Sequence, residues 1–310
     1  MKKWLLVSLV VIVAALGAIY IFIPARLEVV QITTINCTTS GAYRHLTTPD
    51  KWKAWWPGTP STTSLLHFQN NSFAIAKTLL NSLEVRILHN ERPAVNSTLH
   101  LLPATHDSTS IQWSCSVVTS LNPLKRIQQY QYAIAIKNNM AVVLGFFKSF
   151  AEKKENIYGI SLQETIYKDS LLISLKTSVS SYPSVKTIYS QINSLKEYSA
   201  SYQAQPTGKP IMNITPLYPF GFQVMTALPI DRAIPVSGPF IKQRIPLNRF
   251  LVTRVHGGDA TANEALHQIQ LYIQDYHRTL MALPFQQLIT DRSAEQDTTR
   301  WITDIYVPLF

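Results

Sequence analysis

The sequence predicts an α+β protein in three parts: an N-terminal transmembrane helix, a strand-rich domain closed by a long helix, and a duplicated β-α-β-β domain. Three observations support this architecture. An uncharged apolar run covers residues 4–23, strand-like runs separated by Asn, Asp, Pro and Ser fill residues 64–119, and two amphipathic helical patterns recur in the C-terminal half. We expect boundaries at residues 1–25, 26–156 and 157–310.

Composition limits the classes of partner. The 310 residues include 46% hydrophobic and 15% charged residues, which excludes a disordered chain and leaves room for more than one core. The formal charge is +10, from 28 Lys and Arg against 18 Asp and Glu. These basic residues are scattered in pairs, and no helix-turn-helix pattern precedes either domain, so we expect no nucleic-acid partner. Attraction to an anionic membrane surface is the simpler explanation of the charge.

The first segment has the length of a membrane span. Residues 4–23 carry no charge, and about 20 helical residues cross a hydrocarbon layer of ~30 Å. Lys2 and Lys3 precede the run, so the positive-inside rule places the N-terminus in the cytoplasm and the two domains outside it. The alternative is a cleaved signal peptide, but the run is longer than the usual signal and lacks a clear cleavage site. We expect a single-pass anchor in the cell membrane.

Two cysteines, Cys37 and Cys115, lie in strand-like stretches. An extracytoplasmic location would permit a disulfide between them. The sequence leaves this alternative open beside two separate buried thiols.

The first domain reads as a strand over 26–37, two short helices, several antiparallel strands and a final helix. Thr38 or Thr39 can cap the first of these helices, and Asn122 with Pro123 begins the last stretch. The final piece has apolar residues at spacings of three and four, which is typical of one helical face: Met140, Val143, Phe147 and Phe150.

Residues 50–58 read DKWKAWWPG and follow the short helix around 42–46. Together with the element order, they make this region resemble the SRPBCC superfamily, also called START-like or polyketide-cyclase-like. The resemblance implies a helix-grip fold, in which a curved sheet wraps the last helix around a cavity for hydrophobic ligands. Trp55 and Trp56 would then line that cavity, and plain packing in the core is the alternative.

The second domain contains an internal duplication. Helical patterns over 184–200 and 261–281 are each followed by a short strand that begins with proline and by a longer strand that ends in an apolar residue and proline. The longer strands, 222–230 and 301–309, align without gaps. Such a duplication predicts paired sheets with a cleft between the halves, a common place for a ligand.

Residues 249–259 (RFLVTRVHGGD), 288–309 (LITDRSAEQDTTRWITDIYVPL) and 171–180 carry a resemblance to the GyrI-like, or effector-binding, family. The resemblance implies a small-molecule pocket lined by aromatic residues, often with a carboxylate, and some members of the family are hydrolases. Asp304 stands where the family usually has Glu. Gln287 stands where many members have an acidic residue or Tyr.

Strand alternation places Asp304 and Tyr306 on the same face. A desolvated carboxylate beside an aromatic ring would favour an organic cation. On the equivalent strand of the first repeat and just before it, Tyr218, Phe220 and Phe222 are further candidate walls of the pocket. Glu164 is a weaker candidate near the first strand of the domain.

The sequence shows none of the common catalytic signatures: there is no G-x-S-x-G, no Gly-rich phosphate loop and no H-E-x-x-H. Glu264 and His267 form one Glu-x-x-His without a second copy, so we expect neither a metal nor a cofactor. The sequence therefore predicts a membrane-anchored, non-catalytic binding protein for a small hydrophobic or cationic molecule. The alternatives are a hydrolase with Asp304 as general base and Tyr306 polarising the substrate, and a scaffold with collapsed cavities.

Overall fold

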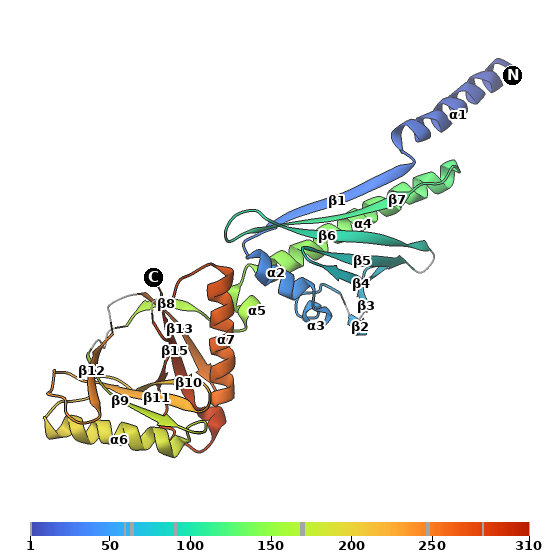
Figure 1. Cartoon of the computed structure of the whole chain (residues 1–310). Helices are drawn as coiled ribbons and strands as arrows, with labels where there is room; N and C mark the ends of the chain where they lie inside the picture. The colour runs from blue at the N-terminus through green and yellow to red at the C-terminus, as the bar shows by residue number, and fades with distance from the viewer. Residues whose placement is uncertain are drawn as a thin grey trace. The chain divides into compact units, whose positions relative to one another are not determined.

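The computed structural model describes residues 2–58, 60–62, 65–89, 92–167, 171–245, 249–280 and 282–309. The chain divides into two units, Met1–Ile157 and Tyr158–Phe310. Each unit combines helices with one curled antiparallel sheet (Figure 1). The predicted α+β class is confirmed at this level.

In unit 1 the described strands follow the order β1-β7-β6-β5-β4-β3-β2, and every pairing is antiparallel. The elements are α1 (Lys2–Phe22), β1 (Arg26–Ile35), α2 (Thr39–Leu46), α3 (Pro49–Trp52), β2 (Pro60–Thr62), β3 (Leu65–Phe68), β4 (Asn71–Leu79), β5 (Ser82–His89), β6 (Arg92–Pro103), β7 (Thr109–Val118), α4 (Pro123–Ala151) and α5 (Lys154–Tyr158).

Local sequence explains where these elements begin. The Thr38 side chain accepts a hydrogen bond from Gly41 N and caps α2. Asn122 does the same for α4 through Leu124 N and Lys125 N, with proline as the first helical residue. Burial alternates along β7, because one face of the strand packs against the interior of the unit.

The interior of unit 1 is filled by aromatic rings. Trp52, Trp55 and Trp56 pack on one another with ring centroids 4.8–5.8 Å apart. Trp55 also meets Phe147 of α4, and Trp56 meets Phe73 of β4. Both tryptophans that the resemblance placed at a ligand cavity are therefore buried among other rings.

The predicted transmembrane helix is contradicted. Over the described residues, no helix is both long and apolar enough to cross a membrane. Helix α1 ends against α4, where the Arg126 guanidinium lies 4.7 Å from the centre of the Tyr20 ring and Arg126 Nε donates to Ile23 O at 2.7 Å. The last turn of the apolar run is thus packed within unit 1. The predicted localisation, a cell-membrane anchor with a cytoplasmic N-terminus and extracytoplasmic domains, is corrected by the same finding.

Cys37 and Cys115 are both buried and are not joined by a disulfide. Of the two alternatives that the sequence left open, the structure therefore has two separate buried thiols. Burial, with a smaller effect of Glu28, raises the pKa of Cys115 to about 12.

In unit 2 the described strands follow the order β12-β9-β11-β10-β14-β15-β13-β8. The order strand, helix, strand, strand occurs twice, as β9-α6-β10-β11 and β13-α7-β14-β15. The elements are β8 (Gln163–Ile166), β9 (Leu171–Val179), α6 (Val185–Ser201), β10 (Ile211–Pro216), β11 (Phe222–Pro229), β12 (Phe240–Arg244), β13 (Arg249–His256), α7 (Asp259–Asp275), β14 (Phe285–Leu288), a short 3-10 helix (Thr298–Arg300) and β15 (Ile302–Pro308).

The two long helices of unit 2 cover one face of its sheet (Figure 1). Ile188 and Ile192 of α6 pack on Met212 and Val224 of the first repeat, and α7 contacts β13 and β15. Because side chains alternate along a strand, the neighbours of these residues point to the opposite face. That second face carries a separate cluster of Tyr167, Leu172, Ile211, Ala227, Phe250 and Phe285.

Arg292 is a buried residue that forms hydrogen bonds with elements of both repeats. Its buried guanidinium donates to Asp259 Oδ1 of α7 and to Thr303 Oγ1 of β15, each at 2.8 Å. Its backbone N donates to Tyr189 OH of α6 at 2.6 Å. One residue thereby joins both helices to the second half of the sheet.

We predict opposite effects of two glycine substitutions in unit 1. A Cβ at Gly58 would lie 1.8 Å from His67 O, whereas a Cβ at Gly145, inside α4, would meet nothing within 4 Å. Gly58→Ala should therefore lower the free energy of unfolding by about 1–3 kcal/mol through overpacking. Gly145→Ala should raise it by about 0.5–1 kcal/mol because alanine restricts the unfolded chain. Urea titrations followed by tryptophan fluorescence measure both, and equal effects would contradict the packing described.

We also predict that Cys115 is inert in the folded protein. With a pKa of about 12, roughly one thiol in 10⁴ is ionised at pH 8, and the thiolate is the reactive form. Iodoacetamide at pH 8 should leave the peptide that contains Cys115 unmodified, and should label it fully in guanidinium chloride. Mass spectrometry of the digested protein reads out both states. Labelling of the folded protein at the denatured rate would contradict the assignment.

Candidate functional site

The two repeats of unit 2 are joined by a short strand pairing. β10 and β14 are in register only at Ile211 with Gln287 and at Met212 with Gln286. Beyond that point Asn213 Nδ2 donates to Pro284 O at 2.7 Å and bridges the two segments. The sheet can curl at this junction because so few ladder hydrogen bonds fix it, and a cavity lies on each face beside it.

The larger cavity measures about 590 Å³. It lies on the face of the sheet that α6 and α7 leave uncovered, since Leu172, Ile211, Phe250 and Phe285 of its wall belong to the core cluster of that face. The full described lining is Leu172, Lys176, Ile211, Asn213, Met225, Gln243, Arg244, Ile245, Phe250, Ala282, Leu283, Pro284, Phe285 and Pro308.

Two further aromatic rings, Tyr306 and Tyr167, pack against Phe285 of this wall. Phe285 stacks on Tyr306 with centroids 5.1 Å apart and planes 13° apart. Tyr167 meets both rings edge-on, at 5.2 and 5.0 Å. Gln287 Nε2 donates to Tyr167 OH at 3.4 Å, so the polar end of the tyrosine has a partner. These contacts fix the positions of the rings and make the wall rigid.

The charge on the larger cavity is positive. Among its described lining residues the charged ones are Lys176 of β9 and Arg244 of β12. Lys176 is the register partner of Met225, so an ammonium group and a thioether lie side by side on neighbouring strands. The cavity therefore offers apolar surface together with basic groups.

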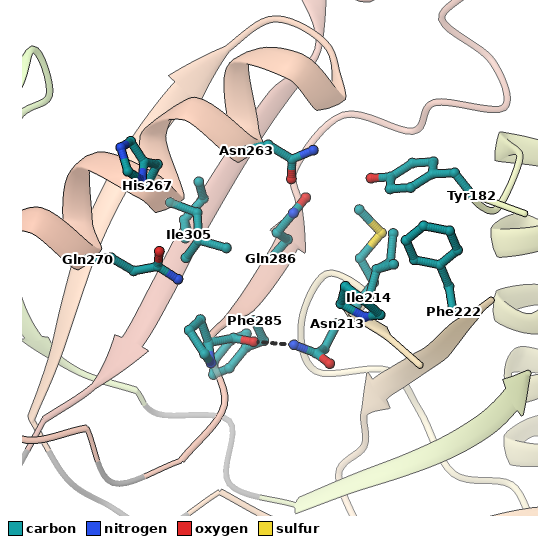
Figure 2. A pocket seen from close by; sticks show the side chains of 14 residues that line it. Tyr182, Asn213, Ile214, Phe222, Asn263, His267, Gln270, Phe285, Gln286 and Ile305 are labelled. Carbon is teal, nitrogen blue, oxygen red and sulfur yellow. Dashed lines mark hydrogen bonds between the residues drawn. The ribbon is translucent and has the colours of Figure 1, made fainter. Parts of the chain in front are cut away.

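The smaller cavity, of about 330 Å³, lies on the helix-covered face (Figure 2). Asn263, His267 and Gln270 of α7 line one side of it together with Ile305 and Gln286, and Tyr182 and Phe222 lie on the other side. Burial, reinforced by the charge of Asp259, raises the pKa of Tyr182. This cavity is more polar than the first, and its described lining contains no carboxylate, lysine or arginine.

Asp304, the principal residue expected at the ligand, lies on β15 with 6% of its surface exposed. Its two oxygens accept hydrogen bonds from Arg254 Nε and Nη2 at 2.7 and 2.8 Å. These bonds raise the pKa of the Arg254 guanidinium. Asp304 is not among the described lining of either cavity, and its charge is compensated across the strand pair.

The other expected residues are divided among several places. Tyr306 packs beside Phe285, a wall residue of the larger cavity, and Phe222 lines the smaller cavity. Tyr218 and Phe220 are 100% and 89% exposed. Glu164, on β8, lies 3.8 Å from Arg278. Trp55 and Trp56 belong to the aromatic interior of unit 1.

Sequence reasoning missed Lys176, Met225 and Arg244. One signal was present for the first of them: Lys176 is a single charge within the apolar strand 171–179. A charged residue at a strand position next to apolar neighbours indicates either solvent or a cavity on that face. No such pattern distinguishes Arg244, because it lies among other basic residues in the sequence.

No family model matches the chain, and no curated protein matches it in sequence. Solved structures do match. The EcmrR C-terminal domain is 15% identical, over 49% of this chain and 98% of that one, with a TM-score of 0.42. SAV2435 bound to tetraphenylphosphonium is 12% identical, over 49% and 94%, with a TM-score of 0.33. Zhui aromatase/cyclase from Streptomyces sp. R1128 is 10% identical, over 40% and 93%, with a TM-score of 0.31. At these values the similarity concerns fold alone, and function has to be inferred from the cavities themselves.

We predict a measurable coupling between Arg254 and Asp304. Arg254→Met, Asp304→Asn and the double variant form a cycle that isolates the pair. The Arg254 side chain is 58% exposed, so solvent screens the interaction and the coupling should be about 1–2 kcal/mol, below that of a fully buried pair. The free energies of unfolding come from urea titrations, and the coupling should fall in high salt. A coupling within error of zero would contradict the geometry.

Proposed function

We propose that unit 2 binds a small lipophilic molecule that carries an acidic group, in the larger cavity. The supporting observation is a cavity of about 590 Å³ with an apolar and aromatic wall and two basic residues, Lys176 and Arg244. This volume is within the range of about 300–1,000 Å³ that small-molecule sites occupy.

The wall favours an apolar body for the ligand. Met225, Ile245 and Leu283 are partly or largely exposed and would lose water when such a body enters, while Leu172, Ile211 and Phe250 already form a buried floor. Burial of apolar area contributes about 25 cal/mol per Å². Asn213 and Gln243 add a small number of hydrogen-bonding groups, which fix orientation rather than supply most of the affinity.

The charges favour an acid rather than a base. A carboxylate or sulfonate near Lys176 and Arg244 would gain charge-assisted hydrogen bonds, while a cation would be repelled. The principal carboxylate that the sequence offered for a cation, Asp304, is paired with Arg254, and the weaker candidate, Glu164, lies 3.8 Å from Arg278. The cationic ligand remains the competing outcome of the experiment.

Binding without catalysis fits the surroundings of Asp304 better than hydrolysis does. A general base has to lie within reach of the substrate. Asp304 is not among the described lining of either cavity, and its carboxylate is paired with Arg254. The open volume likewise favours a binding protein over a scaffold with collapsed cavities.

The experiment compares two dyes with the same rings: 8-anilinonaphthalene-1-sulfonate, which carries the acidic group, and N-phenyl-1-naphthylamine, which lacks it. Fluorescence titration of the full chain should give about tenfold tighter binding of the sulfonate, equivalent to about 1.4 kcal/mol. The preference should shrink in high salt. Tetraphenylphosphonium serves as the cationic competitor, and it should displace neither dye.

Variants locate the site. Lys176→Met should reduce the preference for the sulfonate severalfold and leave the neutral dye unchanged, whereas Lys186→Met, at an exposed position of α6, should change neither. Met225→Trp, which fills the cavity, should weaken both dyes. Circular dichroism checks that each variant is folded. Stronger binding of the phosphonium, or dye binding that Met225→Trp leaves intact, would refute the proposal.

A further inference from the structure

Unit 1 contains a groove that is lined almost entirely by residues with polar, uncharged side chains. It measures about 230 Å³ and lies apart from the tryptophan-rich interior of the unit. Its described lining is Gln69, Asn70, Asn71, His89, Gln128, Gln131, Tyr132, Ala135 and Asn139. Six of these nine residues carry carboxamides, an unusual composition for a helix face turned toward a sheet.

Helix α4 supplies one side of the groove. The lining residues of α4 are spaced by three, one, three and four positions, which places them on one helical face: Gln128, Gln131, Tyr132, Ala135 and Asn139. The opposite side comes from the turn between β3 and β4, residues 69–71, and from His89 at the end of β5. Two sheet segments and one helix thus converge on the same space.

Two polar atoms of the wall are buried without a partner among the described residues. Asn71 is 4% exposed, and its Oδ1 makes no hydrogen bond. His89 Nδ1 is also buried and makes no hydrogen bond to a described residue. The His89 ring contacts the Tyr132 ring edge-on, with centroids 5.5 Å apart. An unsatisfied buried polar group destabilises the fold, because it has lost its hydrogen bonds to water without gaining others. A molecule in the groove that donates to Asn71 Oδ1 would remove this destabilisation.

The chemistry of the wall narrows the occupant. No carboxylate, lysine or arginine is among the described lining residues, so the groove selects neither for an anion nor for a cation. Within the described chain no group of three His, Cys, Asp or Glu side chains could hold a metal ion. In the described wall only Ala135 and the ring of Tyr132 present an apolar group of their own, and the remaining apolar surface comes from the side-chain carbons of polar residues, so the wall has no apolar patch for a lipophilic body.

Carboxamides are matched by hydroxyl groups. Each carboxamide presents a donor and an acceptor side by side, and a pair of adjacent hydroxyls presents the complementary acceptor and donor. We propose that this groove binds one unit of a neutral saccharide, with a hydroxyl donating to Asn71 Oδ1 and the carboxamides of α4 holding adjacent hydroxyl pairs. Water alone and a peptide amide are the competing occupants.

The test uses saturation-transfer NMR on the full chain with methyl β-D-glucopyranoside. Glucuronate and glucosamine are its charged counterparts, and N-acetylglycinamide represents a peptide. We expect a dissociation constant on the order of 1 mM for the glucoside, because a single sugar unit makes few contacts and loses its freedom of motion. The charged sugars should bind at least threefold more weakly, and the peptide amide should give no signal.

A matched pair of variants on α4 locates the binding. Gln131→Leu removes an exposed carboxamide of the groove, and Asn138→Leu removes an exposed carboxamide of the same helix outside it. The first should weaken glucoside binding about tenfold, and the second should leave it unchanged. Three results would each overturn the proposal: no glucoside signal, equal binding by Gln131→Leu, or preference for the peptide amide. Binding of the naphthalene dyes to unit 2 should be unchanged in both variants, so the two proposals fail separately.

Discussion

The architecture of unit 2 depends on how short the strand ladder is between its two repeats at the centre of the sheet. β10 and β14 share two residue pairs, and the junction adds one backbone hydrogen bond, from Leu288 N to Pro210 O, and one side-chain bridge from Asn213 to Pro284. Each repeat keeps its own helix, but the apolar clusters include residues of both repeats: Leu288 of β14 packs with the α6 residues, and Phe250 and Phe285 pack with Leu172, Ile211 and Ala227. Arg292 joins the helices to the second half of the sheet. A continuous ladder would favour an evenly packed sheet. The short junction instead leaves space on both faces, and the larger space is the basis of the proposed function.

Charge decides what that space can accept. The bidentate pair of Arg254 and Asp304 removes the negative group from consideration, because the carboxylate is largely buried and both of its oxygens already accept hydrogen bonds. Lys176 and Arg244 have no acidic neighbour in the described wall. A ligand anion would therefore meet positive charge without a competing carboxylate in the wall, and because Lys176 and Arg244 are exposed, solvent and salt screen this attraction. The groove of unit 1 has no charged residue in its described wall and is rich in carboxamides, so charge does not select its ligand.

The fold was largely accessible from local patterns. Alternation located β7 and β15, the Asn122–Pro123 pair located the start of α4, and the recurring strand-helix-strand-strand order was visible before the structure. The helix expected over 261–281 ends at Asp275, because the chain turns at His277 with a positive φ of 49°. Length and hydropathy predict a membrane span for the apolar run before residue 24, but neither property contains information on the packing of Tyr20 against Arg126.

The candidate site is less accessible from the sequence than the fold. Alternation placed Asp304 and Tyr306 on a common face but could not show that Arg254, 50 positions away, holds the carboxylate. Nor could it show that strands far apart in sequence bring Lys176, Met225 and Phe285 to one wall.

The most direct measurement is a crystal structure of the full chain soaked with 12-bromododecanoate, located by the anomalous signal of bromine. The account predicts a single bromine peak on the open face of the unit 2 sheet, among Met225, Phe250 and Phe285, with the carboxylate toward Lys176 or Arg244. A peak between α7 and β10, or beside Asp304, would contradict it, as would a soaked crystal whose larger cavity stays empty while the acid binds elsewhere.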